Sequence, residues 1–351
     1  MSATQINTKQ RSLSIDMVKG LSIMTLFFLH FENGWMNYEY NYFIVRSPAF
    51  YIVVGWLWGM SSNKKTIKGH WTKRKEGLVK PYIWLSIIFL CFDAMMVILK
   101  QYDFTILGRD LFKTLSLKGI GTLWFLPALL GGEMLFIYLK DKSTVTKVLS
   151  YLTCTTYIIS TNDLAKAIYT NNQTLDFVSK SLLEIIYDIS NAYIYISIAY
   201  HISRKLGKTL FKQKRSFLFI SGIVLLIASF YSMNYKQIFL FSLPIFFEIH
   251  LLLFAYTCSG IGVLLLFKSL EHFRPLSVPL AYCGKNSLTI MAFHFCLLFP
   301  ITLIFDKNIL GHSHYYGDIT IIYFLVAVIL QIGIIELVNR KFPYIIGKSK
   351  N

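Results

Sequence analysis

The chain has little charge for its length. Only 15% of its 351 residues are Asp, Glu, Lys or Arg, whereas a soluble domain has about 25%. Hydrophobic residues make up 55% of the chain, and long apolar runs recur from end to end. The shortage of charge excludes an ordinary soluble protein. These features predict an all-α, polytopic integral membrane protein that forms one domain over residues 1–351.

Cysteine is also scarce, and its spacing fits neither a disulfide framework nor a metal site. His312 and His314 lie close together on an expected outer loop, but no set of further ligands accompanies them. No metal site is therefore predicted. The cysteines lie in or beside apolar segments and are expected to be small buried apolar residues. They are Cys91, Cys154, Cys258, Cys283 and Cys296.

Ten apolar segments have roughly the 17 to 25 residues that a helix needs to cross a bilayer. The polar start and the lack of a small-residue cleavage site predict a retained signal anchor rather than a cleaved signal peptide. Residues 1–12 and 340–351 are expected to be cytoplasmic tails. The predicted spans are 13–33, 43–61, 79–99, 122–140, 145–161, 181–203, 216–233, 244–267, 280–305 and 318–339.

The distribution of basic residues predicts the orientation of the chain. With both ends in the cytoplasm, the inner segments hold 26 of the 35 Lys and Arg residues and the outer segments hold 9. This is the positive-inside pattern of a multi-pass plasma-membrane protein. The net charge of +17 is therefore assigned to contact with membrane lipids, not to nucleic acid. The basic outer loop 100–121 is an exception, either a re-entrant or substrate-facing segment or a tolerated deviation.

The first span, DMVKGLSIMTLFFLH, contains three ionisable residues. Lys19 and His30 are eleven residues apart, which places them within roughly 20° of one helix face and about 16 Å apart along the axis. Asp16 lies one turn before Lys19 on the same side. Ionisable residues in a membrane helix normally face the bundle interior or a water-filled cavity. Two simpler interpretations stay open: Asp16 pairs with Lys19 at the interface, and His30 is a buried structural residue.

Further polar residues are candidates for the same site. Glu133 is an isolated acid in the fourth span, suited to orienting or protonating a histidine. Asn286 and Ser287 precede His294, and Ser287 and His294 share a helix face. These three residues are expected either to line a cavity opposite His30 or to hydrogen-bond neighbouring helices together.

Five segments in order resemble those of the acyltransferase-3 family of integral membrane acyltransferases. They are Asp16, Lys19, Gly20 and His30 in the first span, FYIVVGWLWG (Phe50 to Gly59), KRKEGLVKPY (Lys73 to Tyr82), GTLWFLPALL (Gly121 to Leu130) and CGKNSLTIMAFHF (Cys283 to Phe295). The chain looks closest to the fucose 4-O-acetylase-like branch, which modifies surface glycans. It departs from the family at Lys19, where Arg is frequent, and at Val54, where Ser is usual.

The resemblance implies O-acetyl transfer from cytoplasmic acetyl-coenzyme A to a sugar hydroxyl of a cell-surface or lipid-linked glycan. His30 is the expected general base, with Glu133 and His294 as further catalytic candidates; an acyl-histidine intermediate is the covalent alternative. Lys19 and two cations of the basic inner loop 62–80, Lys73 and Arg74, are expected to bind the donor's phosphates. Asp16, Trp124, Asn286 and Ser287 are assigned to the acceptor or to structure.

Two other functions stay open at this point. One alternative is an O-succinyltransferase, which would have the same fold and use a succinyl donor in place of an acetyl donor. A transporter or flippase for a lipid-linked sugar would also need polar groups in its spans and basic inner loops. No pair of Gly- or Pro-broken segments repeats in the two halves, although that pattern is typical of secondary transporters. The sequence does not identify protein partners.

Overall fold

The computed structural model describes residues 12–33, 47–61, 67–170, 172–235, 243–294, 296–297 and 317–348. Within these ranges every regular element is helical, which confirms the predicted all-α class. Six helical stretches there are long and apolar enough to cross a membrane. The main helices are α1 (Leu13–Asn33), α2 (Pro48–Met60), α3 (Ile67–Arg74), α4 (Lys80–Ile98), α5 (Phe104–Leu115), α6 (Phe125–Leu139), α7 (Thr144–Ala167), α8 (Gln173–Ile202), α9 (Lys208–Leu210), α10 (Arg215–Met233), α12 (Ile245–Leu270), α13 (Arg274–Lys285) and α15 (Gly317–Lys341).

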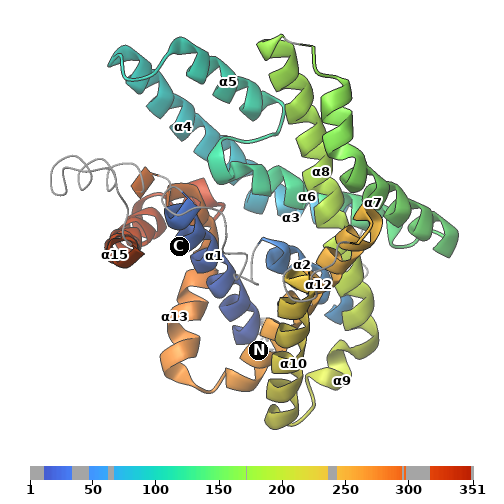
Figure 1. The fold of residues 1–351 in the computed structure, drawn as a ribbon. Coiled ribbons are helices and arrows are strands. Elements are labelled where there is room, and N and C mark those ends of the chain that lie inside the picture. The colour runs from blue at the N-terminus through green and yellow to red at the C-terminus, as the bar shows by residue number, and fades with distance from the viewer. Residues whose placement is uncertain are drawn as a thin grey trace, which may run out of the picture.

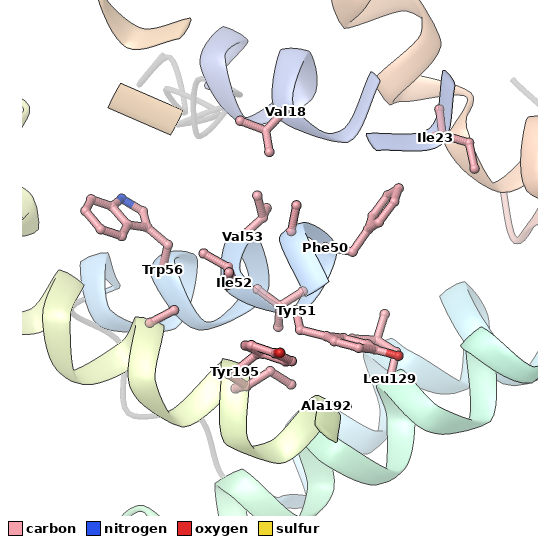
Figure 2. Close-up of a cluster of buried hydrophobic side chains, with 14 of the residues drawn as sticks. Val18, Ile23, Phe50, Tyr51, Ile52, Val53, Trp56, Leu129, Ala192 and Tyr195 are labelled. Carbon is pink, nitrogen blue, oxygen red and sulfur yellow. The ribbon is translucent and has the colours of Figure 1, made fainter. Parts of the chain in front are cut away.

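Helix α2 forms the centre of the packed core. Its residues from Ala49 to Trp56 are all buried, because helices pack on several of its sides. Figure 2 shows Ile52 and Val53 between Val18 of α1 and Tyr195 of α8. Pro48 suits the start of this helix, because the first turn has no intrahelical partner for a backbone amide. A helix that is apolar all round is expected in such a position.

Helices α1 and α13 touch backbone to backbone, and they lie side by side in Figure 1. A Cβ added to Gly20 would lie 1.9 Å from the carbonyl oxygen of Leu280, and one added to Gly284 would lie 1.8 Å from that of Asp16. Only glycine permits this approach, as in other helix pairs packed in lipid through small residues. The contact fixes the position of the first span against the ninth.

Every predicted span except the ninth coincides over most of its length with one helix. The ninth was predicted as a continuous helix over 280–305, but α13 ends at Lys285 and a second helical segment begins at residue 287. The side-chain amide of Asn286 donates to the Tyr282 carbonyl, and its backbone amide is shared between the Tyr282 and Cys283 carbonyls. A side chain that competes for backbone acceptors in this way favours a turn.

Two segments that were expected to be loops are largely helical. The inner loop 62–80 contains α3 and a π-helical turn, Lys75–Val79, which leads directly into α4. The outer loop 100–121 contains α5, which packs against α4. The side chain of Asp103 accepts a hydrogen bond from the Thr105 amide at the start of α5, and this bond lowers the pKa of Asp103.

The prediction that all cysteines are buried is wrong for Cys91 and Cys296, which are exposed at the surface of the helix bundle. Their surroundings are apolar because lipid, rather than protein, covers that surface. Only Cys258 is fully buried. His312 and His314 lie outside the described residues.

Candidate active site

The histidines of the first and ninth spans form a pair. His30 in the last turn of α1 and His294 of the segment 287–294 are joined by a hydrogen bond of 2.8 Å between His30 Nδ1 and His294 Nε2. Their rings are stacked, with centroids 4.9 Å apart and planes 20° from parallel. Phe27, one turn before His30, packs edge-on against the His294 ring. The structure thus brings together two of the three residues expected to be catalytic.

The hydrogen bonds define which nitrogen of each ring bears the proton. His294 Nδ1 lies 3.0 Å from the carbonyl oxygen of Ile290, which only accepts, so Nδ1–H must donate. With both rings neutral, His294 Nε2 then accepts from His30 Nδ1–H, since a neutral imidazole has one donor and one acceptor. This leaves Nε2 of His30 as its unprotonated, basic nitrogen. The pair therefore presents His30 in the tautomer that a general base requires.

A cavity of about 350 Å³ lies next to this pair, towards the N-terminal half of α1. Lys19, Lys73 and Arg74 are its cationic lining residues, and Ser287 contributes a hydroxyl. Met291, one turn before His294, also lines it, which places the histidine pair directly beyond the cavity. The rest of the wall is mostly apolar. Its other lining residues are Ile23, Phe50, Val54, Leu57, Trp58, Ser61, His70, Gly77, Leu78, Phe125, Leu126, Leu129 and Leu288.

Glu133 holds two residues of the cavity wall. Its carboxylate is completely buried in α6 and contacts His70 Nε2 at 3.3 Å through one oxygen and the Arg74 guanidinium through the other. Both partners come from α3, where a spacing of four residues puts them on one face. Trp58 of α2 packs against the His70 ring at a centroid distance of 5.1 Å. Glu133 therefore meets a histidine, as predicted, but this histidine is His70 rather than His30 or His294.

The remaining predicted site residues have different surroundings. Asn286 accepts from Asn339 of α15 and from Lys348, so it links helices as the packing alternative proposed. Trp124 ends a 3₁₀ turn and packs against Phe125, beside the cavity rather than in its wall. Asp16 is buried one turn before Lys19, where its carbonyl faces Gly284.

His70 was not among the predicted site residues. Its segment, HWTKR, was expected to be part of a basic inner loop, whereas His70 is almost fully buried. Its Nδ1 is buried and has no hydrogen-bond partner in the described part of the chain. The four-residue spacing between His70 and Arg74 was the available signal, since both would lie on one face of a helix. Such a spacing becomes informative only once the segment is known to be helical.

Comparison with known proteins identifies the family. Residues 12–336 match the family model for the acyltransferase-3 domain, described as an acyltransferase domain. A search among curated proteins gave no match, and a search among solved structures gave none. The match covers most of the chain, including both histidines and the whole cavity wall. Together with its apolar helices, it shows that this chain is a multi-pass membrane acyltransferase of the acyltransferase-3 family.

Proposed function

We propose that this protein transfers an acetyl group from cytoplasmic acetyl-coenzyme A to a sugar hydroxyl of a cell-surface or lipid-linked glycan at the plasma membrane. The observation that supports this best is the His30–His294 pair directly beyond a cavity with three cationic lining residues. A cation-lined cavity suits a phosphorylated donor that enters from the cytoplasm. A paired imidazole beyond it suits the activation of a hydroxyl.

In the proposed reaction His30 acts as general base through Nε2. It takes the proton of the sugar hydroxyl as the oxygen attacks the thioester carbonyl. The carbon–oxygen bond forms, the carbon–sulfur bond breaks, and His30 returns the proton to the sulfur, so that coenzyme A leaves as the thiol. His294 keeps the His30 ring in the required tautomer and orientation. The covalent alternative, in which His30 attacks the thioester itself, uses the same nitrogen.

The donor is proposed to bind with its phosphates at Lys19, Lys73 and Arg74. Lys19 lies in the second turn of α1, and Lys73 and Arg74 end α3, within the expected cytoplasmic loop 62–80. The apolar walls beyond them suit the uncharged arm that bears the thioester. Glu133 serves this site by holding Arg74 through one carboxylate oxygen, while His70 contacts the other oxygen. Lys19 keeps the charge of the Arg that is frequent in the family but not its bidentate geometry.

Lys73→Gln is expected to raise the KM for acetyl-coenzyme A about tenfold, the effect of losing one charge-assisted hydrogen bond. The kcat should change little, because Lys73 lines the cavity proposed for the donor, whereas neither His30 nor His294 lines it. Lys75→Gln is the matched control, since Lys75 is exposed in the same segment and does not line the cavity. Steady-state kinetics in isolated membranes measure both. Equal KM values for the two variants would contradict the placement of the phosphates.

Deleting the protein from its cell is expected to remove ester-linked acetyl groups from a surface glycan and to leave the amount of that glycan unchanged. Mild base releases such esters, and mass spectrometry of the released acid distinguishes acetate from succinate. Loss of the glycan itself would instead indicate transport of a lipid-linked sugar. Release of succinate in place of acetate would mean that the donor carries a succinyl group, and the proposed site would stay the same.

A further inference from the structure

Two adjoining grooves share no residue with the cavity of the candidate active site. The first has a volume of about 480 Å³ and lies between α6, α7 and α8 near the cytoplasmic ends of these helices. Lys140, Lys147 and His201 contribute its basic groups, and Phe136, Val148 and Ile198 are among its apolar lining residues. It combines cations at the membrane surface with an apolar interior.

The second groove has a volume of about 660 Å³ and runs between α7, α8, α10 and α12. Tyr151, Ile198 and Ile202 line both grooves, so the two are continuous. The wall of the second groove is mostly apolar. It extends from Leu206 and Leu210 at the cytoplasmic end along α12 towards Phe254 and His250. Its shape therefore follows the direction of a lipid chain in the inner leaflet.

Charge and exposure indicate the occupant. Residues 204–215, which adjoin the cytoplasmic end of the second groove, hold six Lys and Arg residues and no acid. In the segment 140–147 the one acid, Asp141, pairs with Lys140 at 3.8 Å between Oδ2 and Nζ, but its side chain is 86% exposed. Solvent weakens such a pair, and the three lysines of this segment leave a net positive charge. Rim residues of the second groove, such as Leu206, Ile220 and Val224, are more than half exposed. In a bilayer, lipid chains cover such a rim, and basic residues at this depth attract anionic headgroups.

We propose that the two grooves together form a binding site for one anionic glycerophospholipid of the inner leaflet. Its phosphate lies among Lys140, Lys147 and His201, and an acyl chain passes the shared residues Tyr151, Ile198 and Ile202 into the second groove. The site is a membrane-facing docking surface, and it does not depend on which glycan the protein modifies. Lys140 also lies 5.1 Å above the ring of Trp58, which lines the active-site cavity. The bound lipid therefore adjoins the wall of the active site.

The test uses the full-length protein purified in detergent and incubated with phosphatidylglycerol or phosphatidylcholine of identical chains. Bound lipid is counted by native mass spectrometry. Preferential retention of one phosphatidylglycerol is expected. Lys147→Gln should weaken that retention about fivefold, since a basic residue near the surface contributes about that factor. Lys147→Arg should restore it. Val224→Trp, which fills the second groove, should also weaken it.

Two control variants separate the site from general lipid contact. Lys166→Gln removes a cation from the opposite end of α7, where its side chain is 80% exposed. Ile227→Trp enlarges an exposed residue of α10 outside the groove. Both should retain lipid like the original protein. Equal retention of the two lipids, equal losses in the controls, or equally effective competition by soluble glycerol phosphate would overturn the proposal. Elution as a single species on size exclusion is required of every variant compared.

Discussion

Replacing His30 with Ala is expected to lower the rate of acetyl transfer by about 10²- to 10⁴-fold, the range that a general base contributes. The KM for acetyl-coenzyme A should change little, because His30 does not line the cavity proposed for the donor. Ester-linked acetyl groups on the glycan should disappear while the amount of glycan stays normal. Mild base release from cells that express each variant measures this outcome.

Two further variants sharpen the test. His272→Ala is the matched control, since His272 is exposed at the end of the turn after α12 and should have no effect. His294→Ala should lower the rate less than His30→Ala, because the base is kept and only its hydrogen-bond partner is lost. Wild-type ester levels in His30→Ala would show that His30 is not the base. Equal losses in His272→Ala would point to a general defect in folding.

Replacing Glu133 with Ala is expected to lower the free energy of unfolding by about 3 kcal/mol, as when one partner of a buried ion pair is removed. The Arg74 guanidinium and the His70 ring would lose the carboxylate that holds both. Donor binding should weaken as well, because Arg74 would no longer be fixed in the cavity wall. Unfolding by SDS in mixed micelles gives the stability, and the KM for acetyl-coenzyme A gives the effect on binding.

The exposed pair of Glu76 and Lys80 provides the comparison for Glu133. Both side chains are about half exposed, and a pair of this kind contributes at most about 1 kcal/mol. Glu76→Gln is therefore expected to leave both stability and KM nearly unchanged. If Glu133→Ala kept its stability but lost catalysis with an unchanged KM, Glu133 would act in the reaction itself rather than by holding Arg74. If Glu76→Gln lost as much stability as Glu133→Ala, the loss in Glu133→Ala would not be due to the burial of its ion pair.

The candidate site could be predicted from the sequence where its geometry is local. Lys19 and His30 share one continuous helix, α1, so their eleven-residue spacing already places them on one face. Arg74 and Lys73 were recognised through their charge and their position before the third span. The break at Asn286 was missed because hydropathy does not register a side chain that hydrogen-bonds a backbone carbonyl one turn earlier. His70 was missed because its segment was read as a loop.

By itself, the sequence determined that this is a multi-pass helical membrane protein and predicted that its basic loops share one side, because hydropathy and charge act on each segment separately. It also determined which residues share a face of each helix. Only the tertiary structure decided which faces meet. In lipid every helix is apolar on the outside, so hydrophobicity does not select partners, and close contacts such as Gly20 with the backbone of α13 do. That packing places His30 against His294. It places Glu133 against His70 and Arg74 instead of against either of those two histidines.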